Sequence, residues 1–362
     1  MKFWLTAITL SALLIPAMGI GPTDTIAPAF SQSVGDAEGS SPAAKKVYDQ
    51  ALAQQRAGNI KEAIQLYSEA IVLNPRLLGA YNNRALAYKT LGKLDKALQD
   101  FNEIIEINPN LALAYNNRAN TYDDMDQAEK AMSDYTRALS IDPKDEQIYL
   151  DRAIAYKKQG KYKEAIADYS KAIELKPTFE RAYGSRAMLY QHEGQMDKAI
   201  ADYTKAIALN PDNPSLYMNR GEAQLLMFKG KDTAEDAKQF LSHAGWGGKQ
   251  APYMVLAGYL GYRMINDDAE AFKLLEQASK KCDQTYWSYL VILCLRKEIT
   301  ETQLLRAANN PEKATVVKAY LGWNYLVDNK NKEAKENLTW VKDNADKNTY
   351  EYRMAVIGLK RL

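Results

Sequence analysis

Residues 78–111 read LGAYNNRALAYKTLGKLDKALQDFNEIIEINPNL, and residues 112–145 follow the same pattern 34 positions later. The first half of this unit has apolar and aromatic residues at helical spacing, and Gly92 ends it because glycine readily adopts a left-handed conformation. A second amphipathic stretch, Leu94–Ile107, ends before Pro109, which cannot continue a helix. The unit is therefore predicted to be two helices joined by a short turn.

The unit recurs along the chain in a single register. Two helices alone cannot bury both of their faces, whereas stacked copies can, so we expect a helical repeat array. Five copies are predicted at residues 44–77, 78–111, 112–145, 146–179 and 180–213, and a sixth begins at residue 214 and then decays. Three columns recur at every step: Pro75, Pro109, Pro143, Pro177 and Pro211; Tyr81, Tyr115, Tyr149, Tyr183 and Tyr217; Ala63, Ala97, Ala131, Ala165 and Ala199. A glycine recurs at Gly58, Gly92, Gly160 and Gly194, with Asp126 in the remaining place.

This pattern resembles the tetratricopeptide repeat (TPR) family. The resemblance implies an all-α fold, a right-handed superhelical solenoid of antiparallel helix pairs, whose first helices line an inner face. The family's small first-helix residue is matched by Ala85, Ala119, Ala153, Ala187 and Gly221, and the aromatic three positions later by Tyr88, Tyr122, Tyr156 and Tyr190. Its second-helix aromatic is matched by Tyr67, Phe101, Tyr135, Tyr169 and Tyr203.

The C-terminal third, residues 248–362, is predicted to contain diverged TPR-like helices closed by a capping helix near residues 349–362. Its tail has the form Tyr320-Leu321-Gly322, Ala334, Leu338 and Tyr350-Glu351-Tyr352, after a Trp-bearing helix. This layout is similar to a periplasmic TPR lipoprotein of the new-lipoprotein-I type. The likeness implies a homodimeric adaptor for envelope proteases and cell-wall hydrolases, although the lipidation Cys of such lipoproteins is missing here.

The N-terminal residues are predicted to direct export. A charged start and a short apolar run give the plan of a secretory signal peptide over residues 1–29, ending at the small-residue site Ala27-Pro28-Ala29. Residues 30–43 are predicted to be a flexible linker before a TPR array over 44–247. We therefore expect a periplasmic or secreted protein with no stable membrane span after cleavage. The alternative is anchoring by an uncleaved N-terminal segment.

Composition argues against several function classes. Lys and Arg number 47 against 45 Asp and Glu, a balance that gives no reason to expect nucleic acid as a partner. The sequence has only two His and two Cys, and the glycines of residues 245–249 lack the spacing of a phosphate-binding loop. We expect no enzyme, no cofactor and no metal site. Asp123, Asp124 and Asp126 are interpreted as a solvated turn, and Cys282 and Cys294 as two free buried thiols.

A charge regularity accompanies the repeats. One arginine column precedes an aspartate column by 16 residues, and both are missing together from the first repeat. We interpret these residues as structural ion pairs between the two helices of each unit, with an arginine ladder for anionic ligands as the alternative. The pairs are Arg84 with Asp100, Arg118 with Asp134, Arg152 with Asp168, Arg186 with Asp202, and Arg220 with Asp236.

The candidate binding residues lie on the first helices. Asparagine offers both a donor and an acceptor, so a row of them could hold the backbone of an extended peptide without reading its side chains. The row resembles the Asn ladder of peptide-binding TPR superhelices, and ordinary polar helix surface is the alternative. The predicted groove residues are Asn82, Asn83, Asn116, Asn117, Asn120, Asp151, Lys157, Arg181 and Asn219.

The sequence thus predicts a non-enzymatic interaction scaffold of the cell envelope that docks an extended peptide or partner protein in its concave groove. The alternative is a structural or self-oligomerising envelope protein whose groove is filled by its own linker, residues 31–42. The carboxylate clamp of intracellular chaperone-binding TPR proteins is not met, because no three consecutive units supply its Lys, Asn and Arg set.

Overall fold

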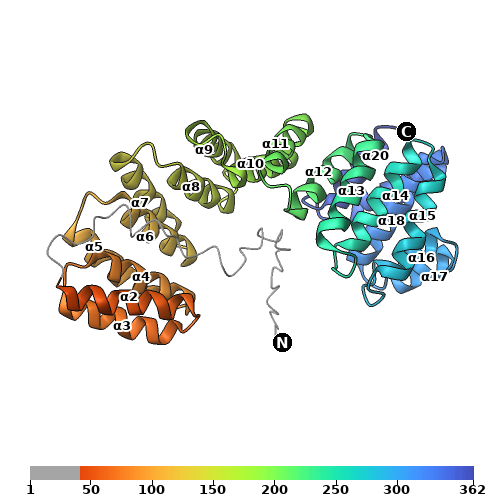
Figure 1. Ribbon diagram of the computed structural model, residues 1–362. Helices are drawn as coiled ribbons and strands as arrows, with labels where there is room; N and C mark the ends of the chain where they lie inside the picture. Colours follow the sequence, from red (N-terminus) through yellow and green to blue (C-terminus); the bar gives the residue numbers. More distant parts are fainter. Residues whose placement is uncertain (1–40) are drawn as a thin grey trace, which may run out of the picture. The chain divides into compact units, whose positions relative to one another are not determined.

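The computed structural model describes residues 41–362, and all its regular elements in that range are α-helices (Figure 1). The predicted signal peptide and most of the predicted linker lie outside the described residues. The helices group into two compact units, residues 41–143 and residues 144–362, and each is described by itself. The boundary expected after residue 247 falls inside the second unit.

The first unit contains three helix pairs, in which each helix packs on the next. Its helices are α2 (Pro42–Arg56), α3 (Ile60–Leu73), α4 (Leu78–Thr90), α5 (Leu94–Ile107), α6 (Ala112–Asp124) and α7 (Ala128–Ile141). Helix α2 begins two residues before the expected start of the repeat array at residue 44. The reason is local: the Ser41 hydroxyl accepts from the Ala44 N–H, and a proline occupies the first turn, where its missing N–H costs nothing.

The second unit continues the same arrangement and then diverges. Its regular pairs are α8 (Glu146–Lys158), α9 (Tyr162–Leu175), α10 (Glu180–His192), α11 (Met196–Leu209), α12 (Pro214–Leu226) and α13 (Gly230–Ala244). The C-terminal helices are α14 (Ala251–Met264), α15 (Asp268–Lys281), α16 (Tyr289–Leu295), α17 (Glu301–Ala307), α18 (Pro311–Val327), α19 (Asn331–Asn344) and α20 (Tyr350–Leu359). The all-α fold of antiparallel helix pairs is thus confirmed.

The turn inside each pair has one residue in the left-handed conformation. Gly92 has a φ of +69°, and Asp126, which replaces the glycine of the third repeat, has a φ of +57°. Aspartate tolerates this conformation better than most residues, so the turn survives the substitution. The same conformation recurs at Phe228, Asn266 and Asn329, which join α12 to α13, α14 to α15 and α18 to α19. The pairs α14–α15 and α18–α19 therefore keep the turn of the repeat, although the repeat's sequence pattern has faded there.

The aromatic residue of each second helix is the centre of its repeat's packing. Small residues on the facing helices, such as Ala85 and Ala119, are fully buried and let the helices approach closely. Removing one large aromatic side chain from water contributes roughly 2–3 kcal/mol, so the aromatic column alone explains much of the array's cohesion. Each member is at most 1% exposed: Tyr67, Phe101, Tyr135, Tyr169 and Tyr203.

The C-terminal helices share one hydrophobic core with the fifth and sixth repeats. This core extends from Met196 to Ala355 and includes the fully buried Trp323. The indole Nε1 of Trp323 donates to the carbonyl of Met354 at 2.9 Å, which ties α18 to the closing helix α20. Helix α20 also contacts α19 and returns to α12. The second unit therefore ends in a closed arrangement of helices, as expected for a capping helix.

Candidate functional site

The predicted ion pairs are present in every repeat that has them. In the second repeat, Arg84 Nε and Nη2 donate to the two carboxylate oxygens of Asp100 at 2.9 and 2.6 Å. The arginine side chain is 17% exposed and the aspartate 5%, so the pair is largely shielded from water. The same two-point geometry joins Arg118 to Asp134, Arg152 to Asp168, Arg186 to Asp202 and Arg220 to Asp236. The predicted contacts between the two helices of each unit are therefore present in the structure.

Each of four arginines also reaches the preceding repeat. The Nη1 of Arg84 donates to the hydroxyl of Ser68 on α3 at 2.9 Å, so one guanidinium joins α3, α4 and α5. The sequence contained the signal, a polar residue 16 positions before the arginine, but only the structure shows the contact. The other contacts are Arg118 to Asn102, Arg186 to Ser170 and Arg220 to Thr204, at 2.8, 2.9 and 3.0 Å. These arginines use their donors to fix neighbouring repeats, which leaves little for a ligand.

The asparagines of the first unit form a chain of amide hydrogen bonds between helices. Asn117 Nδ2 donates to Asn82 Oδ1 at 2.8 Å, and Asn82 Nδ2 donates to Asn83 Oδ1 at 3.1 Å. Asn83 Nδ2 in turn donates to the hydroxyl of Tyr48 on α2 at 2.9 Å. First helices α2, α4 and α6 are thereby connected side by side. A buried polar group needs such partners, because an unpaired one costs about 1–3 kcal/mol.

Three of the predicted groove residues are therefore less accessible than expected. Asn82 and Asn116 are each 2% exposed and Asn83 is 9% exposed. Adjacent first helices lie close enough that residues at these positions fall between them, and their amides serve the packing. Sequence periodicity shows which residues share a helix face but could not distinguish the inner edge of that face from its solvent-facing edge.

The remaining predicted groove residues keep contact with solvent. Asn117 and Asn120 are partly exposed in the first unit, where Asn120 accepts from the Tyr135 hydroxyl. In the second unit, Asp151, Lys157 and Asn219 are partly exposed and Arg181 is exposed. Asp151 accepts from Gln147 Nε2 at 2.7 Å, one turn earlier on α8.

Two cations on first helices of the second unit have no ion pair among the described residues. Lys157 on α8 and Arg181 on α10 belong to first helices of consecutive repeats, and no ion pair within residues 41–362 includes either. Burial lowers the pKa of Lys157, since partial removal from water disfavours the ammonium form. A carboxylate brought to this surface would relieve that cost.

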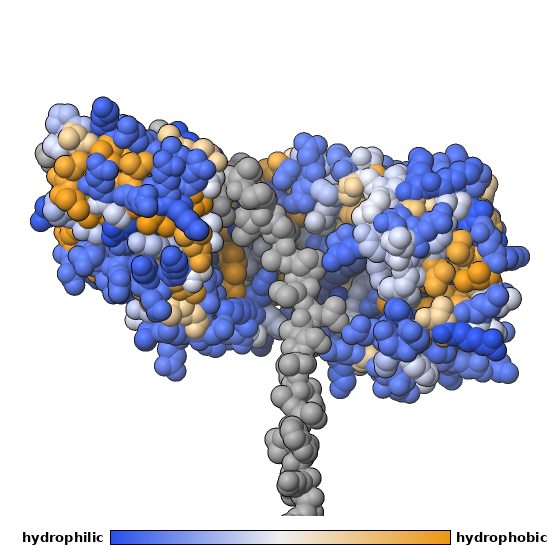
Figure 2. All heavy atoms as spheres, turned by 90° about the horizontal axis from the view of Figure 1, so that it is seen from below, coloured by the Kyte–Doolittle hydropathy of each residue, from blue (hydrophilic) through white to orange (hydrophobic). Residues whose placement is uncertain are grey.

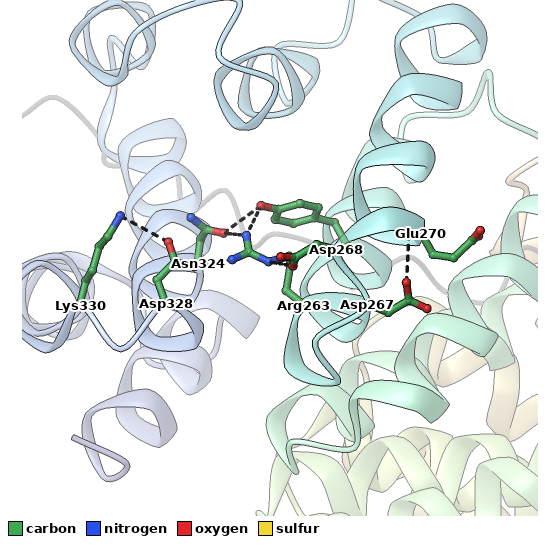
Figure 3. A network of polar contacts seen from close by, with 8 residues as sticks. Arg263, Asp267, Asp268, Glu270, Asn324, Asp328 and Lys330 are labelled. Atoms are coloured by element: carbon green, nitrogen blue, oxygen red, sulfur yellow. Dashed lines mark hydrogen bonds and ion pairs between the residues drawn. The ribbon is translucent and has the colours of Figure 1, made fainter.

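A second polar network was not predicted from the sequence (Figure 3). Arg263 near the end of α14 pairs through Nε with Asp268 Oδ1 at 2.6 Å and donates through Nη1 to the Tyr259 hydroxyl at 2.7 Å. Its Nη2 donates to Asp328, which follows α18, and the Tyr259 hydroxyl donates to Asn324 at 3.1 Å. The network joins two helix pairs of the C-terminal third. Its members follow no repeat period, so no sequence signal marked them.

Other expectations can be compared with the described residues. Cys282 and Cys294 are free and buried, as predicted, and burial raises the pKa of each thiol to about 11. Across residues 41–362, no group of three or more His, Cys, Asp or Glu side chains is arranged to hold a metal ion. No helix in that range combines the length and apolarity needed to span a membrane.

Family comparisons agree with this geometry. The family described as "Tetratricopeptide repeat" matches residues 79–111, 112–145 and 147–179, and the family described as "TPR repeat" matches residues 56–92 and 188–227. This chain belongs to the tetratricopeptide repeat family. No curated protein matches it. Tetratricopeptide repeats form interaction scaffolds that are typically non-enzymatic and bind peptide or protein partners, and the chain has the fold of such a scaffold.

Several solved structures of TPR proteins align with parts of this chain. One is a tetratricopeptide repeat protein from Parabacteroides merdae, 18% identical, covering 75% of this chain and 100% of that one, with a TM-score of 0.48. Another is PilF of Pseudomonas aeruginosa, 19% identical, covering 56% and 90%, with a TM-score of 0.48. YrrB, described as a TPR protein with an unusual peptide-binding site, is 19% identical, covering 49% of this chain and 91% of YrrB, with a TM-score of 0.40.

Proposed function

We propose that this TPR protein is a non-enzymatic scaffold of the cell envelope that docks an extended segment of a partner protein on its first helices. The observation that favours this function is the pair Lys157 and Arg181, two cations on neighbouring first helices without an ion pair in the described part of the chain. The location rests on the signal-peptide plan of residues 1–29.

The chemistry of the surface favours a polar partner segment. Asp151, Lys157, Arg181 and Asn219 offer acceptors, cations and an amide from successive first helices of one unit. Figure 2 shows a largely hydrophilic face with hydrophobic residues in separate patches. Strongly exposed large apolar side chains are few among residues 41–362: Val72, Leu73, Ile265, Phe272, Leu305 and Leu362. A polar column that carries cations therefore suits an extended segment with carboxylate side chains better than an apolar helix.

The experiment is an affinity capture from envelope extract, read by quantitative mass spectrometry. The mature protein, residues 30–362, is compared with the double variant Lys157→Gln/Arg181→Gln. The matched control is Lys163→Gln/Lys205→Gln, which makes the same charge change at exposed positions of second helices. The proposal expects a partner retained by the parent and the control and reduced at least about tenfold in the first variant, as loss of close charge contacts implies.

Two results would contradict the proposal. Equal capture by all three proteins would move the interaction away from the first helices. Recovery of only the protein itself would favour the self-oligomerising alternative, and deleting residues 30–41 then tests whether its own linker fills the surface.

A further inference from the structure

A cluster of tyrosine and glutamate side chains lies where four helices of the second unit meet. Helix α12 contacts α14 and α20, and α18 contacts the same two helices, so the four form a closed ring. Each helix contributes at least one residue to the cluster. We call this set the Tyr–Glu cluster: Glu222 from α12, Tyr253 from α14, Tyr320 from α18, and Tyr350 and Glu351 from α20.

The cluster is held together by one direct contact and by its charges. The Tyr350 hydroxyl donates to the backbone carbonyl of Glu222 at 3.3 Å, which fixes α20 against α12. Burial raises the pKa of Tyr320, and so do the nearby Tyr350, Glu351 and Glu222. Burial and then Glu351 likewise raise the pKa of Tyr253, which also interacts with Ser288. The five side chains therefore share one electrostatic environment.

The two carboxylates of the Tyr–Glu cluster have no cation in contact with them. No ion pair or side-chain hydrogen bond among the described residues includes Glu222, although its neighbour Arg220 on α12 binds Asp236 at two points. Arg353 lowers the pKa of Glu222, but its Nη1 donates to the carbonyl of Asn348 at 3.2 Å and its Nε is buried without a hydrogen-bond partner. Burial, followed by the charge of Glu351, raises the pKa of Glu222 to about 7.

Carboxylates in this state are costly unless a ligand compensates them. Protein surrounds Glu222 and Glu351 closely, yet both keep partial contact with solvent, as do Tyr253 and Tyr350. A close pair of carboxylates favours a positive charge between them. The faces of tyrosine rings attract ammonium and guanidinium groups at distances up to about 6 Å. Partly exposed carboxylates with perturbed pKa values mark a candidate binding site.

We propose that the Tyr–Glu cluster binds the positively charged side chain of a lysine or arginine. The inference rests on the proposed function, because it assigns a basic residue to the partner segment docked by the first helices. Glu222 and Glu351 would accept hydrogen bonds from the cation, and the partly exposed Tyr253 and Tyr350 would offer ring faces above the buried Tyr320. The partner segment would then contain both a carboxylate for Lys157 and Arg181 and a basic side chain for this cluster.

The test uses the full-length mature chain and two short probes, acetyl-Gly-Arg-Gly-amide and its citrulline counterpart, which has the same shape without the charge. Binding is measured by NMR titration near pH 8. We expect the arginine probe to bind at least about tenfold more tightly than the citrulline probe, the difference that one charge-assisted contact of about 1.4 kcal/mol gives. Glu222→Gln and Glu351→Gln should each remove most of that preference, whereas Glu336→Gln, an exposed glutamate on α19, should leave it unchanged.

The pH dependence of probe binding gives a second readout. The groups that face Glu222 are Glu351, Arg353 and Tyr350 from α20, Tyr320 from α18 and Tyr203 from α11. Burial raises the pKa of Glu222 to about 7 and also raises the pKa of Glu351, whereas the phenols stay neutral over this range. Cation binding needs ionised carboxylates, so affinity for the arginine probe should fall severalfold between about pH 8 and pH 6. Glu222→Gln should flatten this dependence.

Three results would overturn the inference: equal binding of the two probes, unchanged preference in Glu222→Gln, or a preference that Glu336→Gln reduces as much. Circular dichroism and thermal melting confirm that each variant is folded, and Glu222→Gln removes a like-charge repulsion rather than a favourable contact. Failure here is separate from failure of the proposed function. The proposed function fails if partner capture is unaffected by Lys157→Gln/Arg181→Gln. The inference about the Tyr–Glu cluster fails if the two probes bind alike.

Discussion

Arg263 and Asp328 form an ion pair across 65 residues of sequence, through the Nη2 of the guanidinium and the Oδ1 of the carboxylate (Figure 3). The arginine side chain is 16% exposed and the aspartate 20%, so water screens the pair only partly. Since Arg263 also holds Asp268 and the Tyr259 hydroxyl, a single side chain joins α14 to the start of α15 and to the turn after α18. The relative placement of these two helix pairs depends on it.

Replacing Arg263 should destabilise the second unit strongly. Arg263→Ala removes the ion pair with the exposed Asp268 and leaves the mostly buried Asp328 with only Lys330, at 3.5 Å, so we expect a loss of about 2 kcal/mol in the free energy of unfolding. Urea unfolding followed by circular dichroism measures it. Arg306→Ala, at an exposed position of α17, is the control and should change stability by less than about 0.5 kcal/mol. Similar stability of the two variants would show that the network contributes nothing.

Arg84 joins α3, α4 and α5, and this predicts energetic coupling between the first two repeats. Arg84→Lys keeps the charge but loses the two-point contact with Asp100, and should cost roughly 2 kcal/mol. Ser68→Ala should cost about 1 kcal/mol through loss of one hydrogen bond. Because both changes remove the same contact, the double variant should cost less than the sum of the single changes. Strict additivity in a double-mutant cycle would argue against the inter-repeat contact.

Glu222 should make stability depend on pH in a predictable direction. Its pKa in the folded protein is raised from 4.5 to about 7. A carboxyl group with a raised pKa contributes stability that is fully present below the unfolded value and is lost as pH rises through the folded value. The parent should therefore lose stability between about pH 4.5 and pH 7 relative to Glu222→Gln. Thermal melting at several pH values measures this, and parallel pH profiles would refute the prediction.

The two cysteines should react slowly while the protein is folded. Cys282 and Cys294 are buried, and burial raises the pKa of each thiol to about 11, so the reactive thiolate is scarce near pH 8. We expect a disulfide-exchanging chromogenic reagent to modify both thiols quickly in urea and far more slowly in buffer. A reducing agent should leave the melting temperature unchanged. Fast modification of the native protein would contradict the burial of both groups.

Local sequence was sufficient to predict the helix pairs. The period places Gly92 at one turn and Asp126 at another, and both adopt the same left-handed backbone conformation. The Arg84–Asp100 contact was also predictable, because its two residues recur at one fixed separation within a unit. The helix that begins at Pro42 shows the usual limit of such reasoning, since a capping serine and a proline extended it beyond the composition boundary.

The candidate site was only partly predictable. The Asn column was identified by its period, but the burial of Asn82 and Asn116 depends on how closely first helices of adjacent repeats approach one another. Periodicity shows which residues share a helix face and leaves open how much of that face a neighbour covers.

Sequence by itself determined the repeat, its turns and the Arg–Asp pairs, because these depend on interactions within about one repeat length, where spacing along the chain fixes spacing in space. The tertiary structure alone brought Arg263 to Asp328 and Tyr350 to Glu222, residues 65 and 128 positions apart. Those contacts follow no period, since they arise where α18 packs on α14 and where α20 folds back on the sixth repeat. Their geometry is set by the packing of one shared core around Trp323, which no local pattern specifies.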